Sequence, residues 1–68
     1  MSETKRLAEL MESDLNRTVG VEIWQNIEKG KLTDFYGSFD DNNQAIVAVE
    51  IDENLTFFLP PNSTIVIY

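Results

Sequence analysis

The C-terminal part of the chain contains three apolar stretches separated by turn-forming sequences. Residues 45–51, 55–59 and 64–68 are rich in β-branched and aromatic side chains, and Asp, Asn, Pro and Ser occupy the segments between them. These stretches are apolar on both faces, a pattern typical of strands that are covered on both sides. A chain of 68 residues has too little mass to cover them by itself. We also expect the last strand, residues 64–68, to present an unshielded apolar edge, which can pair with another chain. We therefore predict a β-rich domain that associates with further copies of itself.

The N-terminal segment has a different period. Residues 3–16 place apolar side chains on one face of a 3.6-residue repeat, and these are Leu7, Leu10, Met11 and Leu15. Ser2 or Thr4 can cap the first turn. The spacing predicts an α-helix over residues 3–16. From Thr18 the period is two, so residues 18–68 are predicted to be strands.

The first hairpin can be read in two registers. Val19, Val21 and Ile23 alternate with other residues and predict the first strand. In the favoured register, residues 28–30 form the turn, residues 31–39 form the second strand and Gly37 bends it. In the alternative register, Asn26 lies in the turn, Gly30 lies within the second strand, and a longer loop runs through residues 36–43.

Composition excludes several kinds of site. The chain has no Cys and no His, which removes disulfides, most zinc sites and the usual nucleophile–base pairs, so we expect no enzyme, metal or cofactor. Residues 40–43 lack the ligand spacing of a calcium loop and are predicted to be a turn. No apolar stretch is long enough for a membrane span and no export signal is visible, so a cytoplasmic protein is expected.

The order of the elements resembles the Sm-like family, which includes the Lsm and Hfq proteins. Residues 19–23 are similar to the family's first strand, Gly30 to its turn glycine and residues 37–39 to its bent second strand. Residues 57–67 are similar to its closing motif. The resemblance implies a single domain, residues 1–68, that is mainly β. Its N-terminal helix would precede a five-stranded, strongly bent antiparallel SH3-like small barrel.

The resemblance also implies a ring of five to seven subunits, in which the fourth strand of one copy pairs with the fifth strand of the next. The corresponding interface residues are Phe57, Phe58, Leu59, Ile65, Val66 and Ile67. Family members bind single-stranded RNA near the pore. The matching candidates here are Tyr36, Asp40, Asn42, Asn43, Asn62 and Ser63. Tyr36 and Trp24 are predicted to be exposed, and Lys5, Arg6 and Lys31 would supply positive charge.

Charge separates two functional hypotheses. The net charge is −7, and residues 60–63 contain no cation where the family carries a basic loop. Phosphate binding would therefore lack its usual electrostatic drive. The first hypothesis is a ring that binds RNA weakly, as an RNA chaperone-type module. The second is an acidic homo-oligomeric protein-interaction module without RNA binding, which docks a basic protein.

Overall fold

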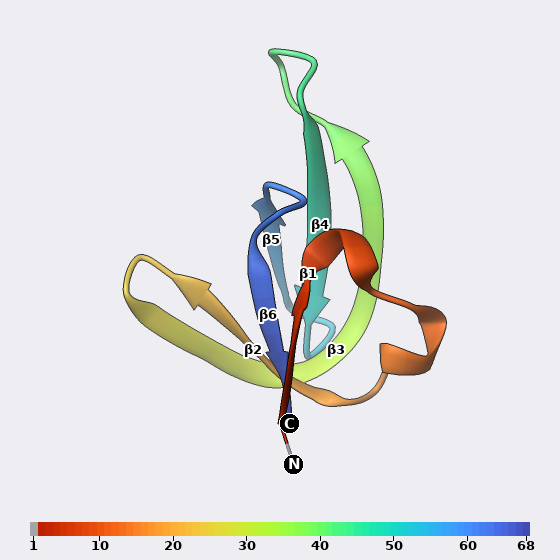
Figure 1. Ribbon diagram of the computed structural model, residues 1–68, viewed down its shortest axis with the longest axis vertical. Coiled ribbons are helices and arrows are strands. Elements are labelled where there is room, and N and C mark those ends of the chain that lie inside the picture. The colour runs from red at the N-terminus through yellow and green to blue at the C-terminus, as the bar shows by residue number, and fades with distance from the viewer. Residues whose placement is uncertain (1) are drawn as a thin grey trace.

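The structure is a computed structural model that describes residues 2–68. These residues are mainly β and form one six-stranded antiparallel sheet with the strand order β1-β6-β2-β3-β4-β5 (Figure 1). The strands are β1 Glu3–Arg6, β2 Thr18–Ile23, β3 Asn26–Phe39, β4 Ala45–Ile51, β5 Leu55–Leu59 and β6 Thr64–Ile67. β2, β4, β5 and β6 lie where the sequence pattern predicted strands. β3 begins at Asn26, earlier than the predicted start at residue 31.

The predicted α-helix over residues 3–16 is wrong. Residues Glu3–Arg6 form β1, and two short 3₁₀ helices follow, η1 Leu7–Glu9 and η2 Glu12–Asp14. Leu7 is buried in the core, whereas Met11 from the same predicted face is 57% exposed. An isolated helix of this length is marginal without a tertiary partner. Residues 3–6 instead form β1, which pairs with the edge of β6 through backbone hydrogen bonds.

The favoured turn at residues 28–30 is wrong, and the alternative register is right in placing Gly30 within the second strand but not in placing Asn26 in the turn. β2 ends at Ile23 and β3 begins at Asn26, so the turn is formed by Trp24 and Gln25. Both residues have positive φ, 51° and 71°. Two consecutive positive φ values match the twist of a two-residue hairpin. Gly30 lies within β3, opposite Val19.

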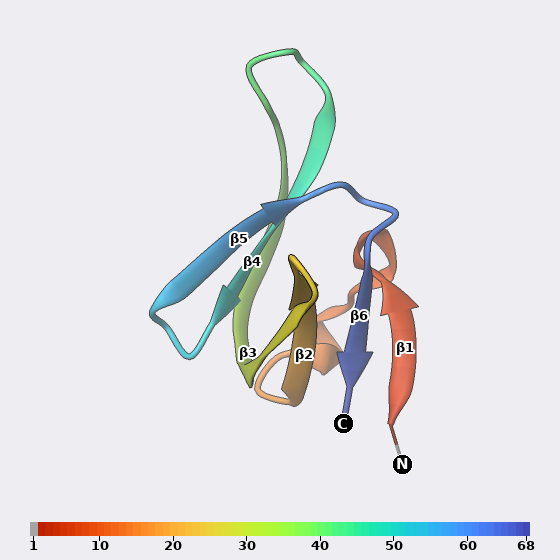
Figure 2. The ribbon, with the colours of Figure 1, turned by 90° about the vertical axis from the view of Figure 1, so that its left-hand side faces the viewer.

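β3 bends and belongs to both halves of the sheet. Its first part pairs with β2, and its last part pairs with β4. The register shifts between Leu32 and Asp34, which marks Thr33 as the bulged residue, whereas the sequence predicted the bend at Gly37. The Thr33 hydroxyl donates to the Glu50 carbonyl at 3.2 Å and accepts the Glu53 N–H at 2.9 Å. The bend sets β4 and β5 apart from β1 and β6 (Figure 2).

The core lies between these two halves of the sheet. Its side chains come from β2, β3, β4 and β6 and from η1, and they are Leu7, Val19, Val21, Leu32, Val47, Val49, Ile51, Ile65 and Ile67. Phe35, Phe57 and Leu59 pack against this cluster from its border. The core therefore unites the N-terminal segment with both halves.

Within residues 2–68 the sheet has two free edges, β1 and β5. β6 lies between β1 and β2, so the expectation that the last strand presents an unshielded edge is wrong. The side chains of Ile65 and Ile67 are fully buried within the single chain, and Val66 is half-buried. Of the predicted interface residues, those on β5 lie on a strand whose outer edge is unpaired. Phe58 is exposed, and Phe57 and Leu59 are half-buried.

Candidate functional site

The Asp40–Gln44 loop, predicted to contact RNA bases, is built around the Asp40 carboxylate. Its Oδ1 accepts the backbone N–H groups of Asn42 and Gln44, both at 2.9 Å. The Asp40 carbonyl accepts the Asn43 N–H at 2.9 Å, and Asn43 has a φ of 61°. Asn is among the few residues that adopt this left-handed conformation readily. The residues therefore have a local role in forming the turn, which accounts for their types without a ligand.

The second predicted RNA loop, residues 60–63, lies against η1. The carbonyls of Pro61 and Ser63 accept the N–H groups of Ala8 at 3.0 Å and Leu7 at 2.8 Å. The β3–β4 hairpin, by contrast, projects away from this loop in both ribbon views (Figures 1 and 2). The structure thus does not bring Asn62 and Ser63 together with Asn42 and Asn43.

The cations are dispersed and mostly engaged by other groups. Lys5 and Arg17 lie beside Asp14, and Arg6 pairs with Glu9. The Lys29 ammonium lies 4.2 Å from the centroid of the Tyr68 ring, a cation–π contact. Among the five cations, Lys31 has an exposed side chain with no ion pair in the described residues. No shared basic surface follows from this arrangement.

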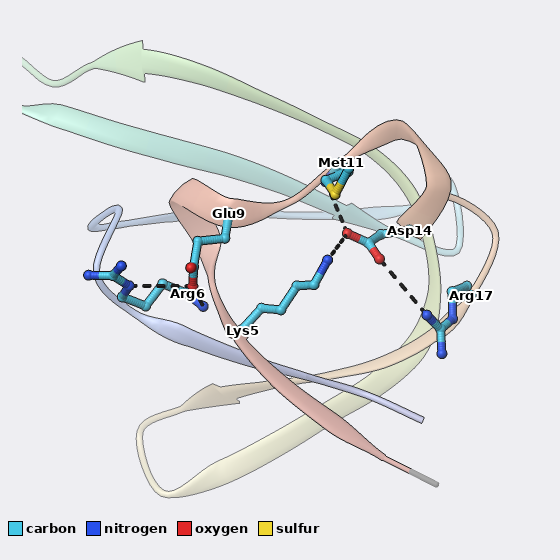
Figure 3. A network of polar contacts seen from close by, with 6 residues as sticks. All are labelled: Lys5, Arg6, Glu9, Met11, Asp14 and Arg17. Atoms are coloured by element: carbon cyan, nitrogen blue, oxygen red, sulfur yellow. Dashed lines mark hydrogen bonds and ion pairs between the residues drawn. The ribbon is translucent and has the colours of Figure 1, made fainter.

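Asp14 is the buried charged residue of the described chain, at 2% exposure. Its Oδ2 accepts the Lys5 ammonium at 3.0 Å and the Met11 N–H at 2.9 Å, and Arg17 Nη1 lies 3.9 Å from Oδ1 (Figure 3). Burial alone raises the pKa of Asp14, but the hydrogen bonds and cations outweigh it, so the pKa lies below its ordinary value. Asp14 therefore joins β1, η2 and the start of β2 as a structural ion pair.

Glu9 forms a second, exposed contact beside this network. Its Oε1 accepts the backbone N–H of Arg6 at 3.0 Å and the Arg6 Nε at 3.4 Å (Figure 3). The backbone hydrogen bond, followed by the side-chain hydrogen bond, lowers the pKa of Glu9. Because both side chains are exposed, the pair contributes little to stability. It fixes the turn from β1 into η1.

An exposed aromatic pair lies on the outer face of β3, β4 and β5. The register places Tyr36 opposite Ala48, and Ala48 opposite Phe58. Tyr36 is 50% exposed and Phe58 58% exposed, whereas Ala48 between them is fully buried. We call Tyr36, Ala48, Phe58 and the unpaired edge of β5 the β5 surface. The sequence predicted the exposure of Tyr36, which is confirmed. It missed the role of Ala48, whose small side chain in an otherwise bulky strand was the available signal.

Trp24 is the most exposed large apolar residue of the described chain. It stands at the tip of the β2–β3 hairpin and is 91% exposed, and Ile27 beside the tip is 59% exposed. The predicted exposure of Trp24 is therefore confirmed. Ile27 was missed because the favoured register placed it in the approach to a turn. This tip lies on a different hairpin from the β5 surface (Figure 2).

Three kinds of binding site are not found in the part of the chain that the structure describes. The surface of residues 2–68 has no detected pocket. Within the same residues, no cluster of acidic side chains has a geometry that could hold a metal ion. No helix among them combines the length and apolar character that crossing a bilayer requires.

Comparisons with protein-family models, with curated proteins and with solved structures found no match for this chain.

Proposed function

We propose that this chain is an acidic protein-interaction module that binds an extended segment along the free edge of β5. The observation that carries this proposal is an unpaired edge strand with exposed apolar side chains. β5 has the sequence LTFFL and pairs on one side only, with β4. An edge of this kind presents free backbone N–H and C=O groups that an added strand can pair with.

The two edges of the sheet differ in how well they are protected. β1 is four residues long and carries Glu3, Lys5 and Arg6, and these charges restrict its pairing to strands of complementary charge. β5 carries no charge and no proline. Added strands gain affinity from the backbone and specificity from side-chain contacts on alternate positions. Phe58, on β5 itself, would supply such a contact on the outer face.

The chemistry around β5 favours a partner with positive charge. Asp52 and Glu53 lie in the turn between β4 and β5, and both are exposed. On the outer face, the row next to the aromatic pair consists of Asp34, Glu50 and Thr56. With a net charge of −7, the chain would attract an extended segment that carries basic side chains.

RNA binding and the Sm-like identity stay predictions. The dispersed cations and the separation of the two predicted loops do not support a base-binding site, and the acidic charge opposes phosphate. A closed SH3-like barrel and a ring are likewise proposals. Pairing of β5 with β6 between copies would require β1 to leave the edge of β6.

The proposal is tested by selecting binders from a displayed library of random ten-residue peptides on the immobilised protein. We expect enrichment of sequences that carry basic residues. Binding should be abolished by Phe58→Lys, because this change removes the exposed aromatic side chain and places a like charge beside a basic partner. Phe39→Lys is the matched control, since Phe39 is also exposed but lies at the end of the β3–β4 hairpin. Circular dichroism would verify that both variants fold. Selected peptides that bind the Phe58→Lys variant as well as the wild type would exclude the β5 surface.

A further inference from the structure

We infer that the segment bound at β5 is β1 of a second copy of this chain, in an antiparallel head-to-tail contact. The inference rests on the proposed function, because it names the partner of the same edge. Within residues 2–68 the sheet ends in two unpaired edges, β1 and β5, and each copy can therefore offer both halves of one contact. Three features of the two edges make them complementary.

The first feature is strand direction. Every neighbouring pair in the sheet is antiparallel, from β1–β6 through β4–β5. In a sheet of six alternating strands, the first and the last run in opposite directions. A second copy added edge to edge with its faces aligned thus brings β1 antiparallel to β5. The contact continues the hydrogen-bonding pattern of the sheet without reversing a strand.

The second feature is the distribution of charge along the two strands. β1 begins with Glu3 and ends with Arg6, whereas the turn that precedes β5 contains Asp52 and Glu53. Antiparallel pairing places the Arg6 end of β1 beside the acidic start of β5. Parallel pairing would place Glu3 there instead. Like charges in that position are unfavourable, so the charge pattern selects the antiparallel orientation.

The availability of Arg6 supports this assignment. Lys5 is half-buried and directed toward Asp14, but the Arg6 side chain is 63% exposed. Its contact with Glu9 is long, at 3.4 Å, and exposed. Arg6 can therefore exchange Glu9 for another carboxylate at little cost in free energy. Glu53 is exposed, and its backbone N–H donates to the Thr33 hydroxyl. Within residues 2–68, its carboxylate forms no hydrogen bond.

The third feature is the match between the faces. On β1, Thr4 and Arg6 alternate with the half-buried Lys5 and so share the outer face. On β5, Thr56 and Phe58 occupy the outer face that also carries Tyr36. With faces aligned, Thr4 and Arg6 of the second copy extend the face of Thr56 and Phe58. The aliphatic part of Arg6 and the Thr4 methyl group then lie beside Phe58, the exposed aromatic residue of β5.

The contact is heterologous, since two different surfaces meet, and it can therefore repeat from copy to copy. Such a contact is useful to a small chain without cysteine, because association is a common route to stability at this size. Whether repetition closes a ring depends on the rotation between copies.

Sedimentation equilibrium of the whole chain at a series of concentrations tests the inference. We expect the wild type to exceed the 7.8 kDa of a single chain as concentration rises. Glu53→Lys is expected to weaken association about tenfold, because it places like charges beside Arg6. Asp41→Lys changes net charge by the same amount at the tip of the β3–β4 hairpin, and it should not weaken association.

A mixing experiment identifies the two strands as each other's partner. Arg6→Glu and Glu53→Lys variants should each associate weakly alone. An equal mixture should recover the wild-type association, because each contact in an alternating assembly then joins opposite charges. Circular dichroism and urea unfolding of each variant would verify that the subunits remain folded. A mixture that associates no better than either variant would overturn the pairing.

The outcomes separate this inference from the proposed function. A wild type that stays a single chain at every concentration, while selected peptides still bind and require Phe58, overturns the second copy as the partner and leaves the β5 edge as a binding site. If Phe58→Lys changes neither peptide binding nor association, the β5 surface has no role and both proposals fail.

Discussion

At the scale of single residues, Asp14 determines how the N-terminal segment is held. It lies on η2 and contacts Lys5 of β1, Met11 and Arg17, so one carboxylate connects parts of the chain that would otherwise be joined only through the backbone. Among residues 2–68, no buried polar side-chain atom lacks a hydrogen-bond partner. The ion pair is thus fully satisfied, and removal of one member leaves the other poorly solvated.

We predict that this carboxylate makes the fold acid-sensitive. The pKa of Asp14 in the folded chain lies below the ordinary value of 3.8. Its stabilisation is therefore complete above pH 3.8 and is lost as pH falls from there through the folded-state pKa. Urea unfolding at a series of pH values below 5 should show the loss. Asp14→Asn should cost about 1–3 kcal/mol at neutral pH and should flatten this part of the profile.

Asp41→Asn is the control for the acid profile, since Asp41 is exposed on the hairpin tip. It should retain the wild-type dependence on pH. An Asp14→Asn variant that loses stability below pH 4 as steeply as the wild type would show that other carboxylates dominate the acid sensitivity.

At the scale of elements, the two glycines of β3 have different roles. A Cβ on Gly30 would lie 2.5 Å from Ile51 Cγ2 and from Asp52 Oδ2. Ile51 is a core residue, and the Asp52 Oδ1 accepts the Lys31 N–H at 2.8 Å, so neither neighbour can move freely. A Cβ on Gly37 would meet nothing within 4 Å. Gly30 marks a close approach between β3 and the end of β4, and Gly37 does not.

Gly30→Ala should therefore destabilise the chain by about 1–3 kcal/mol through overpacking. Gly37→Ala should be neutral or stabilising by about 0.5–1 kcal/mol, because alanine loses less backbone entropy than glycine in a strand. Thermal and urea unfolding of the two variants measure the difference. Equal effects at the two positions would contradict the close approach at Gly30.

The β2–β3 hairpin shows how far local sequence determines an element. The alternation through Val19, Val21 and Ile23 identified β2, but the nearest glycine misidentified the turn. The chain instead turns at Trp24 and Gln25, which have positive φ without being glycine or asparagine. Such residues are unfavourable in this conformation, so local preference argued against the turn that tertiary pairing enforces.

At the scale of the whole molecule, charge is the property that bears on RNA. The net charge is −7, and four of the five cations lie beside acids or, for Lys29, over the Tyr68 ring. We predict no measurable binding of oligouridine or oligoadenosine at low salt, measured by fluorescence anisotropy. Binding that weakens as salt is added would contradict this expectation and support the Sm-like RNA site, because salt dependence reports phosphate contacts.

Tertiary context also decided the assembly surfaces. The sequence pattern predicted an exposed apolar edge on the last strand, residues 64–68, and the family resemblance added residues 57–59 to the interface. In the structure, β6 is flanked by β1 and β2, and β5 alone of the two keeps a free edge. Of the predicted interface residues, Phe58 on β5 is therefore accessible, whereas Ile65 and Ile67 belong to the core.

The sequence by itself determined the mainly β character, the positions of β2, β4, β5 and β6, and the exposure of Trp24 and Tyr36. These features depend on alternation and turn residues, which act within a few positions of the chain. Only the tertiary structure decided that residues 3–6 are a strand, that β3 bends at Thr33 and that β5 is an edge. Each of these features depends on which distant strand pairs with the segment through backbone hydrogen bonds, and the local periodicity of the sequence does not specify that partner.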